Sequence, residues 1–365
     1  MRKQFYILLI FLLVLSSCKT SKVSNESIFI GSKNKSILYT GRVNFEKDSM
    51  AILYWPGTSI KLRFKGADLK VILKDAHNKN YYNIILDGKK INILNPDSVK
   101  TSYNLVSGLQ DKEHTIEIFK RTEWSHGPTY FYGFELGKGT KILSAPKASK
   151  KTIEFFGNSI TAGYANEDLT GDSPDSLFTN NYLAYGAITA RHFDANYYCT
   201  ARGGIGITVS WFPMIMDDMY DRLDPEDASS KWDFSRVTPD IVVVNLFQND
   251  SWIVNKPDYS EFNHRFGQSK PTKDFIISKY MDFIKKIRTE YPKARIICSL
   301  GTMDATREGS VWPDYVKTAV KQMNDSKIYS LFFPYQNYKG HPEVRTHKEM
   351  ADSLINFIDK NNLFN

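Results

Sequence analysis

Cysteine is scarce in this sequence, and no metal-binding pattern accompanies it. There are three cysteines and no CxxC pair, so neither a disulfide scaffold nor a structural zinc site is supported. Cys199 and Cys298 each lie at the end of an apolar run, which is typical of a buried thiol. No histidine-paired cysteine motif is present, and a cysteine nucleophile is therefore disfavoured.

Long apolar runs and long basic runs are also rare. The single long apolar run, residues 5–15, excludes a polytopic membrane protein. The net charge of +8 is spread along the chain, which indicates solubility and weak attraction to acidic surfaces, so no nucleic-acid partner is expected. The 365 residues are 42% apolar. That is enough for a packed core, and the length suggests two domains.

The first residues have the pattern of a secretory signal. Arg2 and Lys3 precede the apolar run, and small residues follow it. Leu15-Ser16-Ser17-Cys18 resembles the bacterial lipobox, whose cysteine is acylated and becomes the new N-terminus. The alternative is an uncleaved anchor helix, but a membrane span needs about 20 apolar residues.

Residues 1–17 are therefore predicted to be a lipoprotein signal peptide, and residues 18–27 a polar tether. We expect the protein to be held by lipid on Cys18 at the bacterial cell envelope. Lys19 follows this cysteine in place of an acidic residue, which favours the outer membrane over retention at the inner one.

Short strands separated by turn signals fill residues 28–145. Ile60–Phe64 and His114–Phe119 alternate apolar and polar side chains, and Asp87-Gly88 after Tyr82–Leu86 is a tight hairpin signal. No helix of useful length is apparent. This region is predicted to be a β-sandwich.

Strands and helices alternate in residues 146–365. Ile241–Val244 is a continuous β-branched run, as expected for a strand covered on both faces. Apolar residues between 276 and 287 recur on one helix face, and residues 344–358 predict a closing helix. This alternation indicates a parallel sheet with helices on both faces. In such folds ligands bind beyond the carboxyl ends of the strands.

A serine follows the first strand of this second half. Ser159, in Gly157-Asn158-Ser159-Ile160-Thr161, comes shortly after the strand that ends at Phe156. At a strand-to-helix turn its hydroxyl would be exposed and its N–H free, as a nucleophile beside an oxyanion site requires. A plain helix N-cap is the alternative interpretation.

Other polar residues follow other strands of the same sheet. His341 lies in a Gly-His-Pro turn before the last helix and could act as the base; His347, within that helix, is the weaker candidate. Asn249 could donate to an oxyanion, and Gly204 could bring a backbone N–H close to a ligand. Each residue alone also suits an ordinary turn, but together they predict one site.

These positions resemble the SGNH (GDSL) hydrolases. The pentapeptide around Ser159 is similar to the first block of that superfamily, and Gly204, Asn249 and His341 occupy the places of its later blocks. The chain after the signal also resembles carbohydrate esterase family 2, bacterial enzymes that remove acetyl groups from xylan and related polysaccharides. The matching stretches are Trp55–Gly66, Asn80–Gly88, Asn181–Arg191 and Gly340–Pro342.

The resemblance implies a jelly-roll-like β-sandwich in residues 28–145, followed by a flavodoxin-like three-layer α/β/α SGNH domain in residues 146–365. It also implies a serine esterase for acetylated plant cell-wall polysaccharide of the xylan or glucomannan type. Ser159 would be the nucleophile and His341 the base. The N–H groups of Ser159 and Gly204 and the Asn249 side chain would form the oxyanion hole. No metal or organic cofactor is required.

The chain departs from the family pattern at three places. Asn158 replaces the usual aspartate before the serine, which is a mild change. Phe247-Gln248 replaces Gly-Thr before the third-block asparagine and is expected to reshape the pocket floor. Tyr338 stands where most members carry an aspartate three residues before the histidine. We therefore expect a Ser–His dyad oriented by a backbone carbonyl, as in some family members, with a distant carboxylate such as Asp304 as the alternative.

Aromatic rings stack on sugar C–H faces, and three tryptophans are candidates for this contact, with core packing as the alternative: Trp252, Trp211 and Trp312. Three residues in the turn before the Tyr130 strand could reach the cleft from the sandwich: Arg121, Glu123 and Trp124.

Two other functions fit the same sequence. The missing aspartate and Phe247-Gln248 favour a catalytically inactive, carbohydrate-binding surface lipoprotein, whereas the intact Ser159, Asn249 and His341 argue against it. The same esterase chemistry could also act on another acetylated glycan, such as peptidoglycan or pectin.

Overall fold

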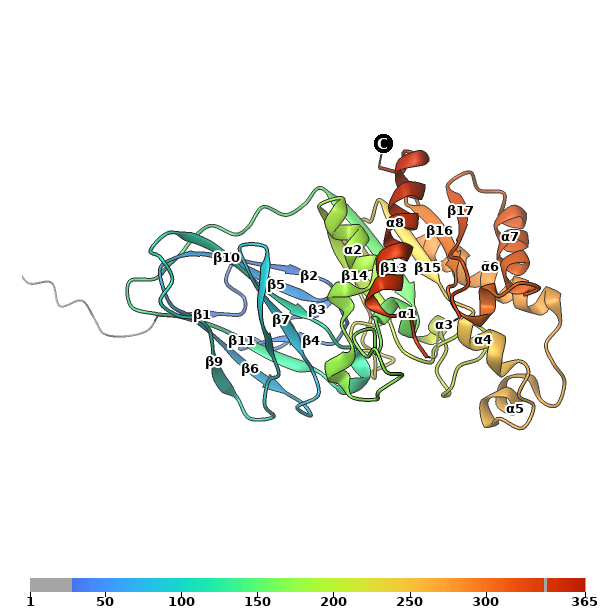
Figure 1. Cartoon of the computed structure of the whole chain (residues 1–365), viewed down its shortest axis with the longest axis horizontal. Coiled ribbons are helices and arrows are strands. Elements are labelled where there is room, and N and C mark those ends of the chain that lie inside the picture. The colour runs from blue at the N-terminus through green and yellow to red at the C-terminus, as the bar shows by residue number, and fades with distance from the viewer. Residues whose placement is uncertain (1–27, 338–339, 365) are drawn as a thin grey trace, which may run out of the picture.

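The protein consists of an all-β body and an α/β body that lie side by side (Figure 1). The computed structural model describes residues 28–337 and 340–364. The predicted signal peptide, Cys18 and tether lie outside the described residues. Within the described ranges, no helix is long and apolar enough to cross a membrane.

Residues 28–142 form two antiparallel sheets that enclose an apolar core. One sheet has the order β3-β4-β11-β6-β9 with β1 beside β11, and the other the order β12-β5-β10-β7-β8 with β2 beside β5. The strands are β1 Ile28–Gly31, β2 Ile37–Thr40, β3 Val43–Asn44, β4 Ala51–Leu53, β5 Ser59–Lys65, β6 Leu69–Asp75, β7 Tyr82–Leu86, β8 Lys89–Leu94, β9 Thr101–Val106, β10 Glu113–Lys120, β11 Thr129–Leu136 and β12 Lys141–Ile142. The predicted β-sandwich is confirmed.

The hairpin predicted at Asp87-Gly88 joins β7 to β8. Both residues have positive φ, 50° for Asp87 and 79° for Gly88. A two-residue turn of this kind matches the right-handed twist of the flanking strands. The Asp87 carboxylate also accepts the Thr115 N–H at 2.8 Å and so ties the turn to β10.

The second half contains one parallel sheet with the order β14-β13-β15-β16-β17. Its strands are β13 Lys151–Gly157, β14 Ala195–Ala201, β15 Ile241–Asn245, β16 Arg295–Leu300 and β17 Ile328–Phe332. Alternate residues of β15 face opposite cores: Val242 and Val244 pack on one face, Ile241 and Val243 on the other. The continuous β-branched run is thus explained by cover on both faces.

Helices cover both faces of this sheet (Figure 1). They are α1 Ser159–Ala162, α2 Tyr185–His192, α3 Met216–Met219, α4 Gln248–Ile253, α5 Ser260–Phe266, α6 Lys273–Glu290, α7 Trp312–Met323 and α8 Val344–Lys360. The short 3-10 helices are η1 Trp124–His126, η2 Ser176–Phe178, η3 Asn181–Leu183, η4 Phe234–Arg236 and η5 Asp304–Thr306. Residues of α6 and α7 pack on one face and residues of α2 and α8 on the other, as predicted for a three-layer fold.

Buried polar contacts join the sandwich to the α/β domain. Arg42 donates to Glu154 of β13 at 2.9 Å, and both side chains are 1% exposed. Trp55 donates its indole N–H to the Leu223 carbonyl at 2.9 Å. Because a buried charge without partners is costly, these contacts fix how the two domains meet.

Cys199 and Cys298 are buried and unpaired. Burial raises the pKa of each thiol to about 12, so neither is a thiolate at neutral pH. The prediction that both are packing residues is confirmed.

Candidate active site

The predicted polar residues meet at the carboxyl edge of the parallel sheet. Ser159 begins α1 after β13, Gly204 follows β14, Asn249 lies in α4 after β15, and His341 precedes α8. All four line one cavity of about 330 Å³. The structure therefore brings together four residues that are spread over 182 positions of the chain.

Ser159 and His341 are in direct contact. The Ser159 Oγ lies 2.8 Å from the His341 Nε2, a distance at which the hydroxyl can donate its proton to the ring. Asn158 accepts the Ile160 N–H at 3.0 Å and caps α1, so the residue that replaces the usual aspartate shapes the turn. As the first residue of the helix, Ser159 has no intrahelical acceptor for its own N–H.

A carboxylate that sequence reasoning missed faces the other side of the imidazole. Asp172 Oδ1 lies 3.0 Å from His341 Nδ1 and accepts the His341 backbone N–H at 2.7 Å. The ring contact is short, but it does not meet the geometry of a hydrogen bond. The close contact with His341 lowers the pKa of the Asp172 carboxyl below its usual range, so this group is a carboxylate at neutral pH.

The expected dyad with an orienting backbone carbonyl is therefore corrected. Asp172 comes from the loop after α1, 169 residues before the histidine, and supplies the carboxylate that position 338 lacks. Asp304, the alternative, instead accepts the Trp252 indole N–H at 2.9 Å and pairs with Arg307 at 2.7 Å.

Tyr164 contacts His341, whereas the other candidate base, His347, lies in the core. The Tyr164 ring packs on the imidazole with centroids 4.8 Å apart and restricts its rotation. His347 is fully buried in α8, where its Nδ1 accepts the Tyr185 N–H at 3.3 Å. Burial lowers the pKa of His347 to about 3; it is a neutral core residue, which agrees with its lower ranking as a base.

The Asn249 amide is held in one orientation beside the serine. Its Oδ1 accepts the Trp211 indole N–H at 3.0 Å, and its Nδ2 donates to the Ile205 carbonyl at 2.7 Å. An indole N–H can only donate, so the oxygen must face Trp211. One Nδ2 hydrogen remains for the cavity that Asn249 lines.

The glycine loop presents a second donor. Gly204 has φ +80°, and within the described part of the chain its N–H has no acceptor.

The turn after Gly204 is held by the buried Asp250 carboxylate, which accepts the N–H groups of Ile207 at 3.1 Å and Thr208 at 2.6 Å. A Cβ at Gly206 would lie 2.0 Å from the Val209 carbonyl oxygen, so only glycine fits there.

Phe247 does not reshape the pocket floor, and that expectation was wrong. Its backbone is left-handed, with φ +80°, and its ring is buried against Tyr280 and Trp312 at centroid distances of 4.7 and 5.0 Å. Gln248 accepts the Ala305 N–H at 3.2 Å. Both side chains point away from the cavity, which explains why a bulky pair is tolerated before Asn249.

The three candidate tryptophans have different environments. Trp211 and Trp252 line the cavity, and both also line an adjoining one of about 490 Å³ that includes Tyr335. Trp312 is 7% exposed and belongs to the core cluster of α6 and α7. The predicted sugar contact of Trp312 is therefore wrong, because its indole packs on Phe247 inside the domain.

Of the three candidates in the turn before the Tyr130 strand, Glu123 reaches the cavity, whereas Arg121 and Trp124 do not line it. The Glu123 carboxylate accepts the N–H of Gly203, the residue before Gly204. Arg121 donates to the loop that carries Asp172. Trp124 is buried at the junction of the domains, with the Arg202 guanidinium 4.6 Å from its ring centroid.

Two family models match the chain. The carbohydrate esterase 2 N-terminal model matches residues 39–146, and that of the GDSL-like lipase/acylhydrolase family matches residues 155–326. The structure of a family two carbohydrate esterase from Clostridium thermocellum in complex with cellohexaose is similar, with 32% identity and a TM-score of 0.79 over 90% of this chain and 99% of that chain. The chain belongs to carbohydrate esterase family two.

It is a carbohydrate esterase similar to acetylxylan esterases. The cellulase/esterase CelE of Acetivibrio thermocellus is 34% identical over 338 residues; the match covers 88% of this chain and 39% of the length of that protein. An acetylxylan esterase/glucomannan deacetylase of Cellvibrio japonicus is 24% identical over 93% of both chains. A family two structure from the same organism has the same fold, with a TM-score of 0.82 at 21% identity over 93% of this chain and 99% of that one.

Proposed function

We propose that this protein removes O-acetyl groups from plant cell-wall polysaccharide of the xylan or glucomannan type through an acetyl-enzyme on Ser159. The observation that carries the proposal is that the His341 imidazole lies between the Ser159 Oγ, 2.8 Å from Nε2, and the Asp172 carboxylate, 3.0 Å from Nδ1. This is the arrangement that acyl transfer by a serine requires.

Acylation begins when Ser159 attacks the acetyl carbonyl carbon and its proton passes to the His341 Nε2. Asp172 keeps the ring proton on Nδ1 and stabilises the imidazolium that forms. Three donors face the developing oxyanion: the N–H groups of Ser159 and Gly204 and the remaining Nδ2 hydrogen of Asn249. The loss of one such donor typically raises the barrier by about 3 kcal/mol.

The imidazolium then protonates the departing sugar oxygen, and the bond between this oxygen and the acetyl carbonyl carbon breaks. Water enters, gives a proton to the neutral His341 Nε2, and attacks the acetyl-enzyme. Collapse of the second tetrahedral intermediate releases acetate and returns the proton to Ser159. Each proton transfer in this cycle thus takes place between Ser159, His341, the sugar oxygen or water.

The substrate class rests on the shape and chemistry of the cleft. The cavity at Ser159 adjoins the second one along Trp211 and Trp252, so an acetyl group can occupy the first while its sugar lies against the indoles. Flat apolar faces with a few polar neighbours suit pyranose rings. Deacetylases of xylan and glucomannan among the relatives, and a relative that binds cellohexaose, support a β-linked polysaccharide.

The alternative of an inactive carbohydrate-binding protein was motivated by the missing aspartate and by Phe247-Gln248. Asp172 supplies the carboxylate, and Phe247 lies in the core. Neither motive for that alternative remains, and the esterase is favoured.

We also propose that the mature protein is attached to the bacterial cell envelope by lipid on Cys18, at the outer membrane or facing the periplasm. The basic start, the short apolar run and the lipobox-like Leu15-Ser16-Ser17-Cys18 support this. In a bacterial host, Cys18→Ser should abolish incorporation of labelled fatty acid and release the protein from the membrane fraction. Membrane retention of that variant would contradict the proposal.

The function is tested by acetate release from acetylated xylan, glucomannan, pectin and peptidoglycan. We expect release from xylan or glucomannan by the wild-type protein and none by Ser159→Ala of equal thermal stability. Release from pectin or peptidoglycan alone would support the esterase reaction and would contradict the proposed substrate class. Wild-type rates in Ser159→Ala would overturn the catalytic assignment itself.

A further inference from the structure

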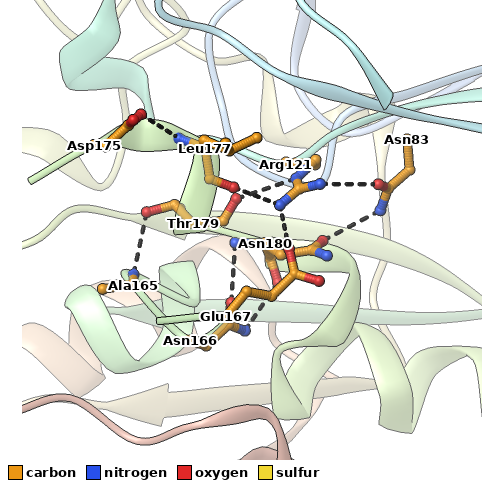
Figure 2. A network of polar contacts seen from close by, with 9 residues as sticks. All are labelled: Asn83, Arg121, Ala165, Asn166, Glu167, Asp175, Leu177, Thr179 and Asn180. Carbon is orange, nitrogen blue, oxygen red and sulfur yellow. Dashed lines mark hydrogen bonds and ion pairs between the residues drawn. The ribbon is translucent and has the colours of Figure 1, made fainter. Parts of the chain in front are cut away.

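Asp172 lies on a long loop that the sandwich holds in place. This carboxylate loop, defined as residues 165–180, runs between α1 and η3 and has only the short η2 within it. Loops of this length without much secondary structure depend on outside contacts for a fixed conformation. Figure 2 shows that side chains of the sandwich, Asn83 and Arg121, supply such contacts.

Arg121 is the central contact. Its side chain is fully buried and reaches from the end of β10 into the carboxylate loop. It donates to the Leu177 carbonyl at 2.7 Å, to the Thr179 carbonyl at 3.3 Å and to the Glu167 carboxylate (Figure 2). Burial lowers the pKa of Arg121, yet a guanidinium remains charged in proteins. A buried charge needs these acceptors, so the loop and the arginine fix each other.

The contacts continue from Glu167 to Asp172. The Glu167 N–H donates to the Phe178 carbonyl at 3.0 Å and closes the base of the loop. The adjacent Asp168 carboxylate accepts the N–H groups of Thr170 at 2.9 Å and Ser173 at 2.8 Å. These two bonds fold the turn that presents Asp172, so the base and the tip of the loop form one connected unit.

The loop is also joined to the histidine segment. The Asn166 carbonyl accepts the Val344 N–H at 3.0 Å at the start of α8, three residues after His341. Arg121 thus contacts a loop that borders His341 both through Asp172 and through Asn166.

We propose that Arg121 is a positioning residue of the esterase: the sandwich domain, through this arginine, sets the place of Asp172 and hence the orientation of the His341 imidazole. The inference rests on the proposed function, because it assigns the sandwich a part in the same catalytic reaction. It also gives a physical reason for the sandwich to be packed against the α/β domain.

The chain offers a matched control for the arginine. Arg42 is also a buried arginine of the sandwich that reaches a glutamate of the α/β domain, Glu154, at 2.9 Å. Its other acceptors are the carbonyls of Tyr220 and Arg222, which lie outside the carboxylate loop. A general loss of domain packing should therefore lower the melting temperature of both Arg42→Lys and Arg121→Lys. A displaced Asp172 should lower kcat only in Arg121→Lys.

The test is a double-mutant cycle on kcat for hydrolysis of 4-nitrophenyl acetate, with the full chain. Lysine keeps the charge of Arg121 but cannot span three acceptors at once. We expect Arg121→Lys to lower kcat by about 10- to 100-fold, as misplacement of catalytic groups by about 1 Å does, with little change in KM. In the Asp172→Asn background, Arg121→Lys should change kcat less than about twofold. Arg121 acts on His341 through the Asp172 carboxylate, which this background already lacks.

Arg42→Lys should lower the melting temperature and leave kcat within about twofold of wild type. Should Arg121→Lys fail to fold, Glu167→Gln takes its place, because Glu167 is 28% exposed and glutamine keeps an acceptor for the guanidinium. The same non-additivity with Asp172→Asn is then expected. Equal fold-losses of kcat in both backgrounds, or wild-type kcat in Arg121→Lys, would overturn the inference.

Failure of the proposed function has a different signature: the wild-type protein would be no faster than Ser159→Ala, whatever residue stands at 121. The nitrogen NMR resonances of the His341 ring then report on its placement. We expect Arg121→Lys to shift them in the wild-type background and not in Asp172→Asn. Unshifted resonances in both backgrounds would contradict the inference independently of activity.

Discussion

Asp172 contacts His341 twice: one carboxylate oxygen accepts the backbone N–H at 2.7 Å and lies 3.0 Å from the imidazole Nδ1. The first contact fixes the segment that carries the histidine, and the second biases the ring towards the tautomer with its proton on Nδ1. That tautomer leaves Nε2 free to accept the Ser159 proton.

Asp172→Asn should therefore lower kcat by about 10- to 100-fold, less than the roughly 10⁴-fold typical of a fully buried triad aspartate, because the Asp172 side chain is 37% exposed. The His341 contact lowers the pKa of this carboxyl, so the wild-type rate should show no dependence on Asp172 titration above about pH 4. Steady-state kinetics on 4-nitrophenyl acetate between pH 5 and 9 measures the kcat of Asp172→Asn and the pH dependence of the wild-type rate. Asp304→Asn is the control, and a larger kcat loss there would assign the orienting role to Asp304.

Asn249→Ala should lower kcat by about 10²- to 10³-fold with little change in KM, because the amide is needed only when the oxyanion forms. Trp211→Phe removes the donor that orients the amide oxygen and leaves the amide itself, so a smaller loss is expected. Comparison of kcat and KM for the two variants on the same ester measures this. A loss below threefold in Asn249→Ala would remove that residue from the oxyanion hole.

Trp252→Ala and Trp312→Ala should have opposite effects. Trp252 lines the cleft, so its loss should raise KM for acetylated polysaccharide about tenfold while kcat for a small acetate ester stays near wild type. Trp312 is a core residue, so its loss should cost about 3–5 kcal/mol of unfolding free energy and leave KM unchanged. Urea unfolding and polysaccharide kinetics on both variants decide the assignment, and a KM effect at Trp312 would contradict it.

His347 should make the protein acid-sensitive. Burial lowers the pKa of His347 in the folded state to about 3, whereas an unfolded histidine titrates near 6.5. Between these values the unfolded chain binds more protons, so the free energy of unfolding falls as the pH falls below about 6.5, by up to about 1.4 kcal/mol per pH unit. His347→Asn, whose side-chain oxygen can accept the Tyr185 N–H, should show a shallower decline.

Urea midpoints at pH 5, 6 and 8 measure this decline. At pH 8 the residue at 347 is neutral in both proteins and in both states, so the difference there gives the cost of the substitution itself. Parallel declines in wild type and variant would assign the acid sensitivity to other groups.

Much of the fold could be predicted because it depends on local patterns. The alternating strands of the first half and the apolar face of α6 each have a characteristic periodicity. The run of β15 is instead continuous, short and β-branched, which favours a strand covered on both faces. The boundaries could be predicted less closely: the closing helix expected over residues 344–358 extends to Lys360. End residues of helices are decided by contacts that no periodicity records.

The convergence of the serine, histidine, asparagine and glycine could be predicted because each lies in a segment that follows a strand of one sheet. Asp172 could not, since it lies inside a loop whose shape depends on Arg121 and on hydrogen bonds between distant residues. Its nearest sequence signal is the polar, turn-forming stretch Thr170-Gly171-Asp172-Ser173, which would fit any surface loop. The prediction that Phe247 reshapes the pocket floor was wrong for a similar reason. Its ring points into the core because the backbone at that residue is left-handed, which the sequence does not reveal.

A serine-reactive fluorophosphonate followed by peptide mass spectrometry tests whether Ser159 is an activated nucleophile. We expect a single labelled peptide containing Ser159, with labelling slowed in His341→Ala and absent in Ser159→Ala. An unlabelled wild-type protein, or a label on another serine with Ser159 intact, would contradict it.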